Sequence, residues 1–274
     1  MKEDQNNQEE APETRRPKRD VKKPAWMNTG EFIVGTAYYA SSSGDPETYQ
    51  EAINSSEREH WVEAMEDEMS SLFENDTWEL VDIPEKTKVI DNRWVFRTKR
   101  NAEGNVQNYR ARLVARGLVQ KAGVDYNETF SPVARYETIR SVLPVSAQDL
   151  HLYQFDVKTA FLYSDIEEEV YMTQPKGFDD GSGRVCKLKR CIYGLKQAPR
   201  CWNKKFSNLL RKQGLKVSEN NPCPFIRNRN KRKLIVTIFV GDGLVAGTSK
   251  EEIMSFLNEL REHFKITSDV LIVS

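Results

Sequence analysis

Two aspartates, Asp156 and Asp242, stand in apolar segments that lie far apart in the chain. A carboxylate in an apolar strand or hairpin costs free energy unless it binds something. If the fold brings the two together, each raises the pKa of the other unless a divalent cation lies between them. Such a pair is typical of the two-metal arrangement that catalyses in-line phosphoryl transfer. The alternative is that Asp242 only forms a turn between Gly241 and Gly243.

The elements predicted from hydrophobic periodicity could hold both aspartates in one sheet. Alternation predicts a strand over His151–Val157, and Leu234–Val240 with Leu244–Ala246 predicts an apolar hairpin around Asp242. The other predicted elements are a short helix beginning at Pro46, a helix Glu57–Glu74, strands Thr77–Val81, Val89–Lys99 and Val106–Arg116, a helix Tyr136–Gln148 that contains Pro144, a hairpin region Val170–Leu188, a basic helix Ala198–Gln213, and a helix Lys250–His263 capped by Ser249. This order predicts an α+β fold.

The composition is that of a polar, globular chain with a charged N-terminal segment. Of 274 residues, 38% are hydrophobic, and no stretch approaches the roughly 20 apolar residues of a membrane span. Residues 1–45 lack the apolar core of a signal peptide, so we expect a disordered linker or tail before one folded domain over residues 46–274. We therefore expect no membrane partner and no secretion. The four cysteines lack zinc-finger spacing, which favours reduced structural thiols over a zinc site.

A net charge of zero conceals blocks of one sign. Ten acidic residues and one Arg lie between Glu57 and Asp82, whereas ten Lys or Arg and two acidic residues lie between Lys86 and Lys121. Eleven Lys or Arg and no acidic residue lie between Arg184 and Lys216. Charge runs are often only solvated faces, but two long basic blocks in one chain favour a nucleic-acid partner. We predict that both blocks face a common cleft that binds a primer–template duplex.

Long motifs in a fixed order resemble reverse transcriptases of the copia type from Trp61 to about Ile266, roughly three quarters of the chain. The motifs are W-x-x-A-M-x-x-E (Trp61–Glu68), NDTWELV (Asn75–Val81), RWVFRTKRNAEG (Arg93–Gly104), YRARLVARGLVQKAGVDYNETFSPVA (Tyr109–Ala134), QFDVKTAFL (Gln154–Leu162), EEEVYMTQPKGF (Glu167–Phe178) and VCKLKRCIYGLKQAPRCW (Val185–Trp202). The resemblance implies the polymerase right hand, here fingers and palm with an antiparallel palm sheet. The sequence ends where a thumb and ribonuclease H would follow, so we expect both to be absent.

The resemblance also implies roles for single residues. Asp156 and Asp242 correspond to catalytic, metal-binding carboxylates that use Mg²⁺, with Mn²⁺ as a substitute. The residues implied to bind the nucleotide are Arg110, Arg112, Phe161, Gly194, Lys196 and Gln197, with Pro199 in the same loop-to-helix element. Guanidinium groups suit phosphate through forked hydrogen bonds. The alternatives are plain core packing for the phenylalanine, exposed strand charges for the arginines and a simple helix N-terminus for the loop.

Gly241 is the main departure from the family's pattern. The family's hairpin carries two consecutive aspartates, whereas this chain reads Phe239-Val240-Gly241-Asp242. The missing carboxylate is the one that shares both metals with Asp156 in the family. Losing a direct metal ligand should cost more than the roughly 10–100-fold that is typical of outer-shell losses. We therefore expect impaired polymerisation.

Two classes of function remain open on the sequence. The first is an RNA-directed DNA polymerase that extends a primer on an RNA or DNA template with deoxynucleoside triphosphates, as part of a retrotransposon Pol polyprotein. The second is a non-catalytic nucleic-acid-binding relic or domesticated module, which Gly241 favours. The resemblance implies a cytoplasmic location, in a virus-like particle, or a nuclear one.

Overall fold

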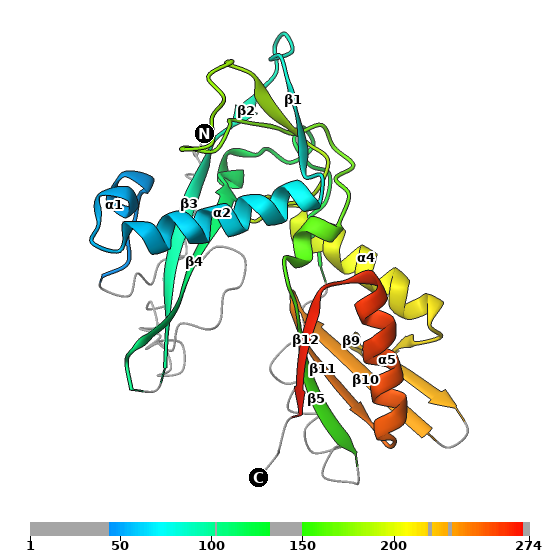
Figure 1. Cartoon of the computed structure of the whole chain (residues 1–274). Coiled ribbons are helices and arrows are strands. Elements are labelled where there is room, and N and C mark those ends of the chain that lie inside the picture. Colours follow the sequence, from blue (N-terminus) through cyan, green and yellow to red (C-terminus); the bar gives the residue numbers. More distant parts are fainter. Residues whose placement is uncertain (1–43, 102, 132–149, 219–220, 230–231, 271–274) are drawn as a thin grey trace, which may run out of the picture. The chain divides into compact units, whose positions relative to one another are not determined.

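The computed structural model describes residues 44–270, except for residue 102 and the segments 132–149, 219–220 and 230–231 (Figure 1). The predicted helix Tyr136–Gln148, with Pro144, lies outside the described residues, and so does nearly all of the predicted tail. The division at residue 46 therefore stays a prediction. Among the described residues, no helix is both long enough and apolar enough to cross a membrane.

A long helix packs against a two-stranded hairpin in the first part of the described chain. Helix α1 (Tyr49–Asn54) precedes α2 (Arg58–Glu74), and β3 (Asn92–Arg100) pairs with β4 (Val106–Ala115). The predicted start of the short helix at Pro46 is wrong, because the Thr48 hydroxyl accepts from the Glu51 N–H and caps α1 two residues later. The predicted helix over 57–74 is confirmed, and its apolar side faces the hairpin.

A four-stranded sheet is built from short segments that are distant in sequence. Its order is β1 (Trp78–Val81), β7 (Val185–Leu188), β6 (Tyr171–Met172) and β2 (Val89–Ile90). All pairs are antiparallel except β2 with β6. The predicted pairing within Val170–Leu188 is confirmed.

The six-stranded sheet contains both aspartates. Its order is β12 (Ile266–Val270), β5 (His151–Val157), β11 (Asp242–Gly247), β10 (Arg232–Phe239), β9 (Asn221–Arg229) and β8 (Lys216–Ser218). All its pairs are antiparallel. The sequence did not predict the three strands β8, β9 and β12, because they are short, polar or rich in Arg and Asn.

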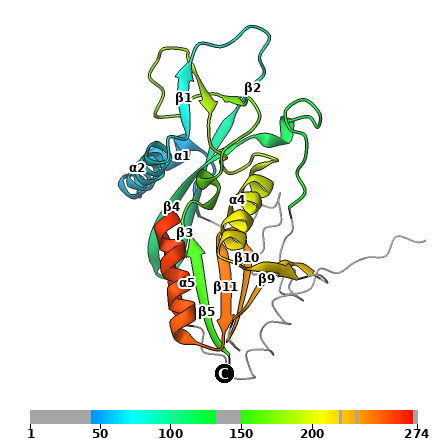
Figure 2. The same cartoon turned by 90° about the vertical axis from the view of Figure 1, so that its right-hand side faces the viewer.

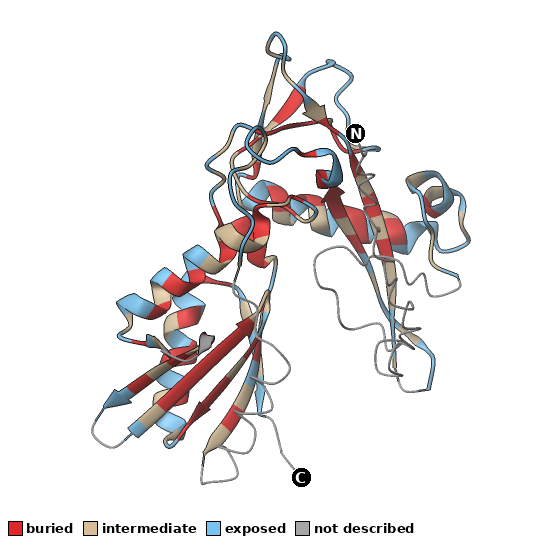
Figure 3. Ribbon diagram, turned by 180° about the vertical axis from the view of Figure 1, so that it is seen from behind, coloured by how far each residue is buried: buried red, intermediate tan, exposed pale blue. Residues whose placement is uncertain are grey.

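Helices α4 (Ala198–Lys212) and α5 (Lys250–His263) cover one face of this sheet (Figure 2). Phe155 of β5 lies against Phe206 of α4, with ring centroids 6.3 Å apart. A Cβ at Gly247 of β11 would come within 3.1 Å of Ile253 of α5. In β10, five consecutive residues from Leu234 to Ile238 are buried (Figure 3), so side chains on both faces of this strand are shielded from solvent.

The mixed α/β architecture with antiparallel sheets is compatible with the expected α+β class. The largest apolar cluster joins α2, the hairpin strands, α4, α5 and the six-stranded sheet. Trp61 and Trp202 are among its fully buried side chains. A well-packed core therefore supports the strands that carry the two aspartates.

Candidate active site

Asp156 and Asp242 lie directly opposite each other on adjacent antiparallel strands. The register pairs Asp242, the first residue of β11, with Asp156 near the end of β5. Residues directly opposite in such a pair point to the same face, with Cβ atoms about 4.5–5.5 Å apart. Phe155 points to the helix-covered face, so the two carboxylates share the other face. Asp242 is a paired strand residue that closes the turn opposite Phe239, so its strand position alone does not decide between a metal-binding and a structural role.

The turn beside Asp242 consists of Val240 and Gly241. Val240 has φ +55°, a conformation that is strained for a β-branched side chain. Two hydrogen bonds hold the turn: Trp202 Nε1 donates to the Val240 carbonyl at 2.7 Å, and the Val157 N–H donates to the Gly241 carbonyl at 2.8 Å. The surrounding structure therefore fixes the backbone where the carboxylates meet.

Gly241 lies immediately beside the Asp156 carboxylate. A Cβ built at position 241 would lie 3.1 Å from Asp156 Oδ1 and 2.9 Å from the Val157 carbonyl oxygen. A side chain here would thus start next to the existing carboxylate, but the backbone of β5 would have to move slightly to accept it. The family resemblance implies a third carboxylate at this position.

The two carboxylates on one face supply some, but not all, of the oxygen ligands that a hard divalent cation requires. Mg²⁺ is typically held by one or two carboxylates together with substrate phosphates and water. Asp156 is half-buried and Asp242 is exposed, so a phosphate ligand could complete such a set. No group of three or more His, Cys, Asp or Glu in the described part of the chain could hold a metal. The donor set fits a cation bound jointly with a phosphorylated ligand better than one held by protein alone.

The Tyr193 ring connects two of the predicted nucleotide-binding residues, Phe161 and Arg112. Phe161, in the 3₁₀ helix Ala160–Tyr163, is buried with its ring edge-on to Tyr193 at 4.9 Å. The Arg112 guanidinium lies over the same Tyr193 ring, 5.0 Å from its centroid. Tyr193 was not identified from the sequence as a candidate site residue, although its position next to Gly194 in the loop-to-helix motif could have indicated it.

Gly194 is required by packing against β4. The residue has φ +91°, and a Cβ there would lie 2.0 Å from the Ala115 carbonyl oxygen. Gly117 is equally confined, because its Cβ would lie 2.1 Å from the Gly194 carbonyl. Close packing of the loop against β4 therefore requires glycine at position 194, and the implied role of Gly194 in nucleotide binding stays a prediction.

Gln197 is buried in a pair of amides that fixes the start of α4. Its Oε1 accepts from Gln120 Nε2 at 3.1 Å, and Gln120 Oε1 accepts from the Lys196 N–H at 2.9 Å. The side chain of Gln197 is therefore committed to the protein, whereas Lys196 is half-buried. Gln120 was also missed from the sequence, since a lone Gln in a loop carries no distinctive pattern.

The β3–β4 hairpin places arginines opposite one another. Arg97 pairs with Arg110, and Val95 pairs with Arg112, so the three arginines share the face away from buried Phe96. Arg110 and Arg112 thus lie on one face of the hairpin, and their implied role in nucleotide binding stays a prediction.

Glu68 of α2 stabilises this hairpin at the unpaired edge of β4. Its Oε1 accepts from the Leu113 N–H at 3.2 Å. Burial raises the pKa of Glu68, and the hydrogen bond from Leu113 and the charges of Arg112 and Arg110 oppose that rise. The carboxylate therefore compensates part of the positive charge of the arginine face.

The second basic block is largely neutralised in the structure. Seven of its cations contact acidic residues from other segments, and the pairs are Arg184–Asp180, Lys187–Glu169, Lys189–Asp76, Arg190–Asp165, Arg200–Glu128, Lys204–Glu167 and Lys205–Asp165. Sequence runs could not show this, because the acidic partners lie outside the block. The count of basic residues alone therefore overstated the positive field of this segment.

Comparison with known proteins places the chain among polymerases of retrotransposons. Residues 75–272 match the family described as reverse transcriptase (RNA-dependent DNA polymerase). The retrovirus-related Pol polyprotein from transposon TNT 1-94 of Nicotiana tabacum is 38% identical over 228 residues, which are 82% of this chain and 17% of that protein. The corresponding polyprotein from transposon RE1 of Arabidopsis thaliana is 36% identical over 230 residues, which are 82% of this chain and 16% of that protein.

A yeast relative extends the similarity beyond plants. The transposon Ty1-BL Gag-Pol polyprotein of Saccharomyces cerevisiae is 28% identical over 204 residues, which are 71% of this chain and 11% of that protein. The chain thus spans less than a fifth of the length of these polyproteins. The matched family covers well over half of the chain, and the site described above lies within the matched residues. The chain belongs to the reverse transcriptase family and is a reverse transcriptase domain of the copia/Ty type found in retrotransposon Pol polyproteins.

Proposed function

We propose that the chain is an RNA-directed DNA polymerase domain with a two-metal site that is impaired by Gly241. The observation that carries the proposal is the register that sets Asp242 directly opposite Asp156, with Gly241 beside both. A divalent cation between two carboxylates that lie directly opposite each other would offset their mutual repulsion.

In this proposal the chain's own residues position the reactants. Asp156 and Asp242 would hold Mg²⁺ or Mn²⁺, which would supply Lewis-acid stabilisation of the charge on the attacking and leaving oxygens. The arginine face of β3–β4, with Arg110 and Arg112, would hold the triphosphate of the incoming nucleotide through forked hydrogen bonds. Phe161 is buried under Tyr193, so it would act by shaping the floor of the site.

The sheet and the hairpin correspond in this proposal to the palm and the fingers of a polymerase right hand. The six-stranded sheet with α4 and α5 would be the palm, and the β3–β4 hairpin with α2 would belong to the fingers. Template, primer and deoxynucleoside triphosphates would be the partners. Within an intact element, the rest of the Pol polyprotein would be a further partner.

Gly241 leaves the site one carboxylate short. The family's three carboxylates offset the charge of two cations and fix their spacing, and this spacing positions the attacking hydroxyl in line with the phosphorus. With Asp156 and Asp242 alone, one cation loses a bridging ligand. We therefore propose that the chain has low polymerase activity. Gly241 also favours a second candidate function, namely a module that binds nucleic acid without catalysis.

Primer extension on an RNA template tests the proposal. Purified protein and its Gly241→Asp variant should be compared with Mg²⁺ and with Mn²⁺ in single-turnover reactions. The variant should extend the primer at least about 100-fold faster, the upper end of the loss seen for outer-shell residues. Circular dichroism and thermal unfolding of both proteins control for the small shift of β5 that an Asp side chain requires.

The outcomes separate the two candidate functions. Equal and substantial rates of primer extension by both proteins would show that Gly241 does not impair catalysis. Two inert proteins that still bind the duplex with equal affinity would favour the binding module. A Gly241→Ala variant is the matched control, because it introduces the same Cβ beside Asp156 without a carboxylate, and it should stay as slow as the parent.

A further inference from the structure

One edge of the six-stranded sheet carries cations that form no ion pair with any described residue. In contrast to the paired cations of residues 184–205, those at the end of α4, on β8 and around the β9–β10 turn form no ion pair within the described part of the chain. We call this set the basic edge, and its members are Arg211, Lys212, Lys216, Arg229, Arg232 and Lys233.

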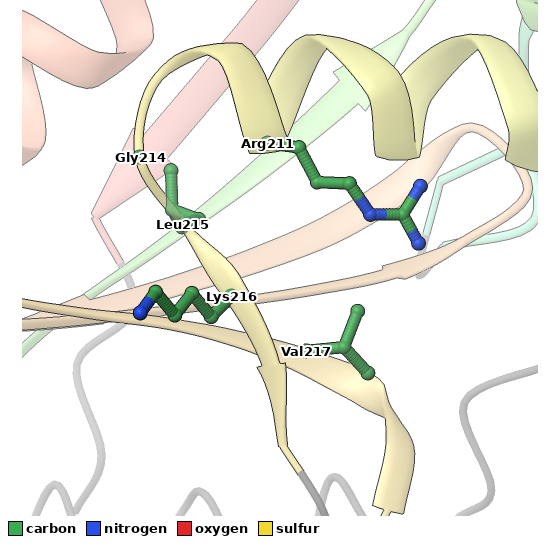
Figure 4. A pocket seen from close by; sticks show the side chains of 5 residues that line it. All are labelled: Arg211, Gly214, Leu215, Lys216 and Val217. Carbon is green, nitrogen blue, oxygen red and sulfur yellow. The ribbon is translucent and has the colours of Figure 1, made fainter.

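The fold gathers these side chains although they come from separate segments. Arg211, Gly214 and Lys216 line one shallow hollow with Leu215 and Val217 (Figure 4). The Arg229 guanidinium reaches the same place from β9, because a Cβ at Gly214 would lie 2.9 Å from its Nη2. Because glycine has no Cβ, the Arg229 guanidinium can lie beside Gly214 and close to the hollow.

Two of these cations are set directly against each other. Arg229 is the cross-strand partner of Arg232, and both side chains are exposed. Like charges directly opposite destabilise a sheet, so this pair reduces stability unless an anion binds between them.

Among the described residues, two acidic side chains at the start of α5 have other partners. Glu252 of α5 accepts from Arg227 at 3.3 Å in a largely buried ion pair. Glu251 accepts from the Ser249 hydroxyl at 2.6 Å; this bond lowers its pKa, and Arg232 adds to that effect. Neither forms an ion pair with a cation of the basic edge, which therefore keeps a net positive field.

We propose that the basic edge binds the phosphodiester backbone of RNA or DNA, away from the reaction site. The edge lies at the opposite end of β10 from the Val240–Gly241 turn, and eight extended residues separate the two by about 23 Å at about 3.3 Å per residue. The site is therefore distinct from the aspartate pair.

The distribution of the positive charges favours an extended polyanion over a single phosphate as the ligand. The Arg211 guanidinium and the Lys216 ammonium extend in different directions from the hollow, so the charge is spread along the edge (Figure 4). Arginine forms forked hydrogen bonds with phosphate oxygens, and lysine adds point charges without reading base sequence. A repeating phosphate backbone fits this spacing of donors.

Fluorescence anisotropy with a labelled 20-base-pair duplex, in EDTA and without nucleotides, tests the proposal. The variant Arg211→Gln/Lys212→Gln/Lys216→Gln should bind more weakly, and the slope of log K against log salt should fall by about 2–3, since each lost phosphate contact removes about 0.9. The matched control Lys187→Gln/Lys189→Gln/Lys204→Gln, in which three ion-paired cations are removed, should change the slope by less than about 1.

A second variant separates loss of binding from loss of folding. Arg229→Gln/Arg232→Gln should bind the duplex more weakly while it unfolds at the same or a higher temperature, because it removes the opposed charges. Unchanged affinity and slope in both variants would overturn the proposal. So would polyglutamate that displaces the duplex at equal charge concentration, because the edge would then recognise acidic polypeptides. Since the assay excludes metal and nucleotide, failure of the polymerase proposal leaves its result intact.

Discussion

Two cross-strand pairs of like charge lie in different parts of the molecule, and they differ in sign. Arg97 and Arg110 face each other on the β3–β4 hairpin, whereas Asp156 and Asp242 face each other on β5 and β11. Either pair is unfavourable by itself. A polyphosphate would relieve the first and a divalent cation the second, which are the two components of a metal–nucleotide complex. If the proposed function holds, each region would bind one component of that complex.

The two regions also differ in what supports them. The hairpin has two strands and depends on α2, whose Trp61 ring lies edge-on to Phe96 and Tyr109 at 5.3 and 4.7 Å. The aspartate pair instead sits in six strands with a central strand buried on both faces. An isolated two-stranded hairpin is at best marginally stable. Damage to α2 should therefore affect the arginine face before it affects the aspartates.

The largest expected effect comes from removing the helix contact of the hairpin. Trp61→Ala deletes a fully buried ring, which should reduce the free energy of unfolding by about 3–5 kcal/mol. Urea unfolding followed by circular dichroism measures the loss. Phe73→Ala on the same helix is the matched control, because this ring is 65% exposed, and it should cost less than about 1 kcal/mol. Equal losses would show that α2 does not support the hairpin through Trp61.

The next effect concerns the aspartate pair in the Gly241→Asp background. Adding Asp156→Asn should slow primer extension by more than about 100-fold, because it removes a proposed direct metal ligand. The same change should leave the melting temperature unchanged or raise it, since it removes one of two opposed charges. A strong loss of both rate and thermal stability would mean that Asp156 is a structural residue.

A smaller effect is expected for the arginine pair. Arg97→Gln should lower the slope of log K against log salt for duplex or nucleotide binding by about 0.9. It should also stabilise the hairpin by about 0.2–1 kcal/mol, because Arg110 then faces a neutral side chain. Anisotropy titrations at four salt concentrations and urea unfolding measure the two quantities. Lys99→Gln, which removes an exposed cation of β3 whose cross-strand partner Asn108 is neutral, is the control for charge alone.

The smallest effect is a pH dependence at Glu68. Burial raises the pKa of this group above its ordinary value of 4.5, so its protonated form is favoured in the folded state. The contribution of Glu68 to the free energy of unfolding is fully present below the ordinary pKa. It declines as the pH rises through the raised pKa of the folded state. In Glu68→Gln this decline should vanish, while the Leu113 N–H still has an acceptor. Urea unfolding between pH 4 and pH 8, on the scale of these ordinary carboxyl pKa values, should show a flatter profile for the variant; parallel profiles would contradict the assignment.

The sequence predicted the elements whose periodicity is strong. The amphipathic side of α2, the alternation of His151–Val157 and the cap at Ser249 each appear where expected. Pro46 misled the prediction, because proline suits a first turn but the Thr48 hydroxyl was the better cap. The strands β8, β9 and β12 were missed because their pairing depends on partners elsewhere in the sheet.

The site was only partly accessible from the sequence. The aspartates could be paired from the order of their motifs, and the register now sets them face to face. The contact of Arg112 with Tyr193 and the amide pair of Gln120 and Gln197 could not be predicted, because they join segments about 80 residues apart without a shared pattern. Neutralisation of the second basic block was hidden for the same reason.

The central claim is that Gly241 leaves the metal site one carboxylate short. Electron paramagnetic resonance of Mn²⁺, titrated into the protein with a primer–template and a non-hydrolysable nucleotide, tests it most directly. The Gly241→Asp variant should bind Mn²⁺ at least about 10-fold more tightly than the parent, and Gly241→Ala should not. Adding Asp156→Asn to the aspartate variant should abolish that gain. Equal Mn²⁺ affinity in the parent and the Gly241→Asp variant would contradict the account.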